Sequence, residues 1–82
     1  MKRILRFTAS WCNPCKAMAA NLGQTDTIIP IEVIDIDVHP EVAEEYGVRN
    51  IPTLVMLHEN IEVKRITGTK TTKELKEWIH ND

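Results

Sequence analysis

The sequence has neither a strong excess of charge nor an apolar run long enough to cross a membrane. Ten Lys and Arg residues stand against twelve Asp and Glu residues, which gives a net charge of −2 over 82 residues. The basic excess that binds nucleic acid or anionic lipid is therefore absent. The longest aliphatic run, at positions 54–57, has four residues, far fewer than the roughly 20 of a membrane-spanning helix. We expect neither nucleic acid nor a membrane among its partners.

Glycine and proline are also scarce, with three and four residues, and 43% of the residues are hydrophobic. Such a composition is that of a folded, soluble protein rather than a disordered one. Because a domain usually takes roughly 100 to 200 residues, we expect a single domain over residues 1–82. Arg6 interrupts the apolar stretch behind the basic start, so no export signal is predicted. We expect a cytoplasmic monomer.

The sequence contains only two cysteines, Cys12 and Cys15, which are separated by two residues. A disulfide between them closes so small a loop that it hardly restricts the unfolded chain, so a stabilising role is not expected. Reactive thiols and half of a zinc site remain as alternatives. Zinc would need two further ligands from His39, His58 and His80, whose spacing does not form a paired motif. We therefore expect no metal, and histidines on the surface.

Periodicity and turn residues predict seven elements in the order βαβαββα. Strands are expected at positions 2–8, 31–36, 53–57 and 61–67. Helices are expected at 12–22, at 40–46, and from a cap at Thr71 to about His80. The strand–helix–strand unit requires a parallel pair, and the last two strands form an antiparallel hairpin. This order predicts an α/β fold, a four-stranded mixed sheet with helices on both faces.

The two cysteines occupy different positions in the helix predicted at 12–22. Cys15 shares an apolar stripe with Met18, Ala19 and Leu22, at i, i+3, i+4 and i+7. Cys12 stands where the helix begins, and there the free backbone N–H groups and the helix dipole favour a thiolate. Loops at the carboxyl ends of parallel strands are the usual place for chemistry in such folds. We therefore expect Cys12 to be the exposed, attacking thiol and Cys15 to be buried.

Two groups of residues form a recognisable pattern around this pair. The first is Phe7, Ala9, Trp11, Cys12, Pro14, Cys15 and Lys16, and the second comprises the segments at 35–37, 46–49 and 51–53. Together they resemble the thioredoxin family, from Ile4 to the last helix. The resemblance is to a minimal, glutaredoxin-sized thioredoxin that lacks the N-terminal strand and helix. It implies a thioredoxin-like fold and a protein-disulfide reductase that works without a cofactor.

The resemblance also assigns roles within the Cys12-Asn13-Pro14-Cys15 motif. Cys12 would form a mixed disulfide with a substrate cysteine, and Cys15 would then attack the Cys12 sulfur and release the reduced substrate. A hydrogen bond from the Cys15 thiol is the nearest further stabilisation of the Cys12 thiolate. Pro14 fixes the backbone between the cysteines. Asn13 replaces the Gly that is usual in the family, so the reduction potential is left open.

A substrate groove beside the cysteines is implied in the same way. Pro52 would follow a cis peptide bond, and Ile51 would offer its N–H and C=O groups to an extended substrate segment. Trp11 would provide an apolar platform, and Gly68 would permit close approach on the far side of the groove. The substrate-binding residues expected by resemblance are Trp11, Asn13, Pro14, Ile51, Pro52 and Gly68.

The implied partners are disulfide-containing proteins as substrates, a thioredoxin reductase as electron donor, and ribonucleotide reductase as one candidate target. Electron transport and cell redox homeostasis are the implied processes. A glutathione-dependent glutaredoxin is one alternative, because the size fits. However, the Cys-Pro-Tyr-Cys motif is absent, and Gly68-Thr69-Lys70 stands where glutaredoxins have a Gly-Gly pair. A non-catalytic subunit of a partner enzyme is the other alternative.

Arg6 and Val33 depart from the family pattern, which has a buried Asp six residues before the first Cys and an associated Lys on the next strand. An arginine cannot accept a proton, so Arg6 cannot replace that Asp as a base. Burial of an unpaired arginine is costly, so Arg6 should reach solvent or find an acidic partner. If its guanidinium lies near Cys15, its charge would favour the thiolate of that residue.

Overall fold

Seven elements alternate along the chain in the order predicted from the sequence. In the computed structural model, which describes residues 1–81, they are β1 (Lys2–Thr8), α1 (Asn13–Gly23), β2 (Ile31–Asp35), α2 (Pro40–Glu45), β3 (Thr53–His58), β4 (Ile61–Thr67) and α3 (Thr72–His80). The predicted ends differ from these by one residue at most. The prediction of one domain over residues 1–82 extends to Asp82, which lies outside the described residues.

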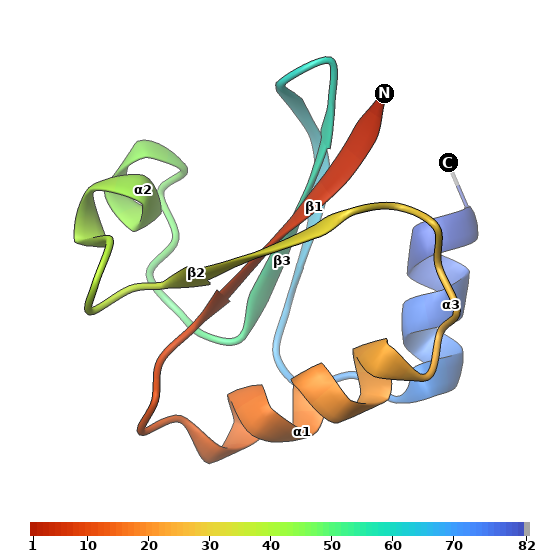
Figure 1. Cartoon of the computed structure of the whole chain (residues 1–82), viewed down its shortest axis with the longest axis horizontal. Helices are drawn as coiled ribbons and strands as arrows, with labels where there is room; N and C mark the ends of the chain where they lie inside the picture. Colours follow the sequence, from red (N-terminus) through yellow and green to blue (C-terminus); the bar gives the residue numbers. More distant parts are fainter. Residues whose placement is uncertain (82) are drawn as a thin grey trace.

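The four strands form one mixed sheet in the order β2-β1-β3-β4. β1 pairs in parallel with β2 and antiparallel with β3, and β3 pairs antiparallel with β4. The hairpin turns at Glu59 and Asn60, whose φ angles are 53° and 67°. Two successive positive φ angles match the twist of the flanking strands. The predicted four-stranded mixed sheet is confirmed (Figure 1).

Helices lie on both faces of the sheet, with α1 and α3 on one face and α2 on the other (Figure 1). Two clusters of buried side chains fill the spaces between these layers. The cluster under α1 and α3 consists of Ile4, Met18, Leu22, Leu54, Met56, Leu75 and Ile79. The cluster under α2 consists of Leu5, Phe7, Ile34, Ala43, Val55 and Leu57. Side chains of β1 therefore alternate between the two clusters, as the period of a strand requires.

The placement of α1 follows from its buried stripe and its contacts with α3. Cys15, Met18 and Leu22 are buried as predicted, whereas Ala19 is half-buried. The Asn21 side-chain Nδ2 donates to the backbone oxygen of Lys70 at 2.8 Å, just before α3 begins. α1 is therefore held against the sheet by apolar packing and against the β4–α3 loop by a hydrogen bond.

The amino terminus of α3 carries the predicted capping box. The backbone N–H of Glu74 donates to Thr71 Oγ1 at 3.1 Å, and the Thr71 N–H donates to Glu74 Oε1 at 3.0 Å. The hydrogen bonds from Thr71 lower the pKa of Glu74 below its usual value. The contribution of Glu74 to stability is therefore present at neutral pH and is lost as the pH falls through that lowered pKa.

Thr71→Ala should lower the free energy of unfolding by about 1 kcal/mol, because one amide at the helix start then loses its acceptor. Urea unfolding followed by circular dichroism measures this loss. Thr71→Ser keeps a hydroxyl and is the matched control, expected to retain most of the stability. Equal stability of Thr71→Ala and the parent would contradict a capping role.

Candidate active site

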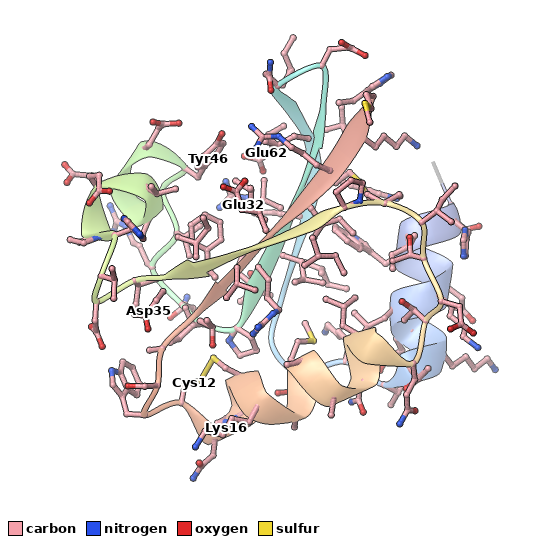
Figure 2. The ribbon with its side chains drawn as sticks, viewed as in Figure 1. Cys12, Lys16, Glu32, Asp35, Tyr46 and Glu62 are labelled. Carbon is pink, nitrogen blue, oxygen red and sulfur yellow. A yellow bond between two sulfur atoms is a disulfide. The ribbon has the colours of Figure 1, made fainter. Side chains whose placement is uncertain are left out.

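Cys12 and Cys15 form a disulfide at the start of α1 (Figure 2). Their Cα atoms are 5.3 Å apart. Cys12 is the N-cap of α1, with the extended dihedral angles φ −92° and ψ 101°. Its Sγ accepts a hydrogen bond from the backbone N–H of Cys15 at 3.2 Å. A donor at a helix start favours negative charge on this sulfur. The disulfide form has no Cys15 thiol, so the hydrogen bond expected from that thiol in the reduced protein stays a prediction.

The expected exposure of Cys12 is wrong for the disulfide form. Cys12 is 4% exposed and Cys15 is 1% exposed. The reason is long-range packing, because both cysteines pack with the buried Ala9 and with the half-buried Ile36 and Ile51. Cys15 is nonetheless the more deeply buried of the two, in agreement with its place on the core-facing stripe. The distinction between the cysteines therefore rests on their position in the helix.

The Ile51–Pro52 peptide bond is cis, as predicted. Pro52 is buried and Ile51 is half-buried beside the cysteine pair. The N–H of Gly68 donates to the oxygen of Pro52 at 2.9 Å, and Thr69 Oγ1 donates to the oxygen of Pro14 at 3.2 Å. Hydrogen bonds thus link the segment with the two cysteines, the loop before β3 and the loop after β4 into one site.

Gly68 is required by its backbone conformation. Its φ is +91°, which side chains rarely adopt. A Cβ at Gly68 would meet no heavy atom of the described chain within 4 Å. Crowding within the chain therefore does not explain this glycine, and close approach by a substrate stays a prediction.

Trp11 lies on the surface next to the disulfide, with 65% of it exposed. Its indole Nε1 donates to Asp37 Oδ2 at 2.8 Å. The backbone N–H of Asp37 in turn donates to Asp35 Oδ1 at 2.9 Å. This network holds the edge of the Trp11 indole that carries Nε1. Asp37 is a site residue that sequence reasoning did not single out, although it lies in the Asp-Ile-Asp segment.

Asp37→Ala should lower the rate of disulfide reduction roughly two- to tenfold, equivalent to the ~0.5–1.5 kcal/mol of one hydrogen bond. The physical reason is that the indole of Trp11 loses the acceptor that orients it. Insulin reduction measures the rate, and Trp fluorescence reports the changed environment of the indole. Asp37→Asn keeps a carbonyl acceptor and should stay close to the parent. Equal loss in both variants would argue against orientation through this bond.

Arg6 is half-buried on β1, one of the two inner strands, so it reaches solvent in part, as expected. Within residues 1–81 its guanidinium has no ion-pair partner. Burial lowers the pKa of Arg6. Its neighbour in register, Val33, is 54% exposed. The departure at these two positions therefore leaves one partly desolvated positive charge on β1.

The three histidines, His39, His58 and His80, are exposed, as predicted. Across the part of the chain that the structure describes, no group of three or more His, Cys, Asp or Glu residues could hold a metal ion. Over the same residues, no helix combines the length and the apolar character that a membrane span requires.

The fold and the bonded pair define a class of protein. A mixed sheet with a Cys-x-x-Cys disulfide at the first strand–helix junction and a cis proline before the third strand is the arrangement of thioredoxin-fold dithiol proteins. The thioredoxin sequence model matches residues 1–81. The chain belongs to the thioredoxin family.

Individual relatives agree with this assignment. The chain is 40% identical over 79 residues to thioredoxin C-3 of Corynebacterium nephridii, covering 93% of this chain and 54% of that protein. It is 37% identical over 75 residues to a thioredoxin of Chlamydia caviae, covering 88% of this chain and 74% of the relative. The chain thus spans about half the length of the first relative and three quarters of the second.

Solved structures give the same result. An N21Q mutant thioredoxin from Halobacterium salinarum superposes with a TM-score of 0.88 at 30% identity, over 95% of this chain and 71% of that one. Oxidised mitochondrial thioredoxin 3 of Saccharomyces cerevisiae superposes with a TM-score of 0.86 at 28% identity, over 99% of this chain and 78% of that one. The predicted thioredoxin-like fold is confirmed. Family, fold and bonded cysteine pair support the predicted class, a thiol–disulfide oxidoreductase of the thioredoxin type.

Proposed function

We propose that the chain reduces disulfide bonds in other proteins by a dithiol mechanism at Cys12 and Cys15. The observation that carries this proposal is the Cys12–Cys15 disulfide at the start of α1, with the Cys15 amide donating to Cys12 Sγ. A bond between these residues closes too small a loop to stabilise the fold appreciably, so a redox role accounts for it better.

The reduced protein begins the reaction as a dithiol. The Cys12 thiolate attacks one sulfur of the substrate disulfide, and the other substrate sulfur leaves as a thiolate. The Cys15 thiolate then attacks Cys12 Sγ in the mixed disulfide. The Cys12–Cys15 bond forms, the bond to the substrate breaks, and its electron pair leaves with the second substrate sulfur. The substrate gains two electrons and the protein returns to the disulfide form.

Six residues around the pair are proposed to bind the substrate. Trp11, Asn13 and Pro14 are exposed beside the disulfide, where a substrate segment could contact them. Ile51 packs against the pair, Pro52 follows it across the cis bond, and the Gly68 N–H donates to the oxygen of Pro52. An extended segment pairing with the backbone of Ile51 would depend little on the sequence of the substrate, which favours broad substrate use.

A disulfide product requires a reductant, so the proposal includes an electron donor. We infer a thioredoxin reductase as this donor, a reducing cytoplasm as the location and a monomer as the working form. Ribonucleotide reductase is one substrate to try. Each of these inferences rests on membership of the thioredoxin family.

Reduction of insulin tests the proposal. With dithiothreitol as reductant, the chain should make the insulin B chain precipitate at least about tenfold faster than dithiothreitol alone, because the positioned dithiol is the better nucleophile. With NADPH, a thioredoxin reductase should sustain turnover without glutathione. A strict need for glutathione and its reductase would indicate the glutaredoxin alternative. No acceleration with any reductant would indicate a non-catalytic role.

A further inference from the structure

Arg6 lies on the face of β1 that α1 covers. Side chains of a strand alternate between faces, so Arg6 is on the same face as Ile4. Ile4 packs in the buried cluster that includes Met18 and Leu22 of α1. Leu54, which pairs with Arg6 in register on β3, packs in the same cluster and is fully buried. The side chain of Arg6 therefore projects into the layer between the sheet and α1.

Arg6 is also near the end of α1 that carries the disulfide. A strand rises about 3.3 Å per residue, so Arg6 lies about 7 Å beyond Ile4 towards the carboxyl end of β1. α1 begins close to that end of β1 (Figure 1). Cys15 precedes Met18 by about one helical turn on the same buried stripe. Arg6 is therefore closer than Ile4 to the end of α1 at which Cys15 lies.

The charge of Arg6 is not neutralised in the disulfide form. Among residues 1–81 no carboxylate lies within ion-pair distance of its guanidinium, and burial lowers its pKa. A partly desolvated cation without a counter-ion is unfavourable, and an anion nearby would offset that cost. Cys15, which is 1% exposed, is a group that becomes an anion during the proposed reaction.

The other charged and titratable groups around this layer come from all four strands, from α1 and from α3. Asp35, at the end of β2, is on the same face as Val33 and Arg6, and its Oδ1 already accepts the N–H groups of Asp37 and Val38 at 2.9 and 3.4 Å (Figure 2). Lys16 is the one charged residue of α1, and it is exposed. The remaining titratable groups on strands of this face and on α3 are Lys2, His58, Lys64, Lys73, Glu74, Lys76, Glu77 and His80.

We propose that Arg6 is a positioning residue in the second step of the reaction. Its positive charge favours the thiolate form of Cys15 when Cys15 attacks the mixed disulfide. This proposal rests on the function proposed above. The Cys15 proton goes to solvent, the Cys15 sulfur bonds to Cys12 Sγ, and the substrate sulfur leaves with the electron pair of the broken bond. Arg6 takes no proton in this step, since a guanidinium is always protonated at the pH of the reaction. It acts through its field, which is strong in a partly desolvated layer.

Stopped-flow reaction of the reduced protein with dithiobis(nitrobenzoate) separates the two thiols. Attack by Cys12 releases the first coloured thiolate at a rate proportional to reagent concentration. Resolution by Cys15 releases the second at a rate independent of that concentration. The pH dependence of the second phase reports the ionisation of Cys15, and the first phase is an internal control.

Arg6→Met and Arg6→Gln remove the charge and keep a side chain of similar length. Each should raise the pH midpoint of the second phase by about half a unit to one unit, which slows that phase roughly three- to tenfold at pH 7. The first phase should change less than about twofold, because Cys12 is stabilised mainly by the helix start. Arg6→Lys keeps the charge and should restore most of the second-phase rate.

Two results would overturn the proposal. One is a second-phase pH profile of Arg6→Met and Arg6→Gln that coincides with the parent profile. The other is an equal slowing in Arg6→Lys, which would assign the effect to packing. Thermal unfolding checks each variant, and Arg6→Met should be at least as stable as the parent because it removes an unpaired charge. Dithiobis(nitrobenzoate) reacts with the thiols without any protein partner. Failure to reduce insulin would therefore refute the proposed function, but it would not decide the outcome of this test.

Discussion

Cys12→Ser should reduce insulin no faster than dithiothreitol alone, whereas Cys15→Ser should trap its substrate. Without Cys12 the thiol at the start of α1 is lost, and Cys15, which lies within the helix on its buried stripe, is not placed to attack a protein disulfide. Without Cys15 the first attack still occurs, but no thiolate is in place to break the bond between Cys12 and the substrate. Turnover therefore stops at the mixed disulfide.

Mass spectrometry and non-reducing electrophoresis measure this difference. Cys15→Ser incubated with disulfide-bonded insulin should gain the mass of one insulin molecule, because a single attack breaks only one of the bonds between the insulin chains, and a reductant should remove it. The double variant Cys12→Ser, Cys15→Ser is the control for adduct formation elsewhere, since the sequence has only these two cysteines. Faster alkylation of Cys15 than of Cys12 in the reduced parent at neutral pH would reverse the two roles.

The order and ends of the elements could be predicted because their signals are local. Alternation along β1, the stripe from Cys15 to Leu22, and the pair Thr71 and Glu74 each lie within one element. The sheet order followed from general rules for connecting strands. The cysteine pair and the cis Ile51–Pro52 bond came from the family pattern, and the structure contains both.

The arrangement of side chains around the cysteines could not be predicted from such local signals in the sequence. Trp11 and Asp37, which share a hydrogen bond, are 26 residues apart, and Thr69 and Pro14 are 55 apart. No periodicity connects positions at such separations. The burial of Cys12 depends likewise on Ile51, which arrives from a distant loop. Contacts made by the tertiary fold, rather than by local pattern, therefore decide the accessibility of the site.

Phe7 belongs to the buried core and also pairs with a strand position next to the site. Its replacement should therefore have the largest effect on the free energy of unfolding. It is fully buried in the cluster under α2, and its ring meets Tyr46 edge-on, with 6.2 Å between ring centroids. Its partner in register on β3 is Thr53, the residue after Pro52. The backbone of Phe7 thus pairs with the strand position that follows the cis proline, while its ring packs under α2.

Phe7→Ala should lower the free energy of unfolding by about 3–5 kcal/mol, because apolar burial is lost and a cavity is left under α2. Total stabilities of small domains are about 5–15 kcal/mol, so this variant should unfold at much lower urea concentration and lose part of its activity at 37 °C. Phe7→Leu fills most of the volume and should lose less than half as much. Ile28→Ala is the matched surface control, since Ile28 is 98% exposed and its truncation should change stability by about 0.5 kcal/mol or less. A loss below about 1 kcal/mol in Phe7→Ala would mean that the cluster under α2 repacks around the missing ring, and that Phe7 does not support the strand beside Pro52.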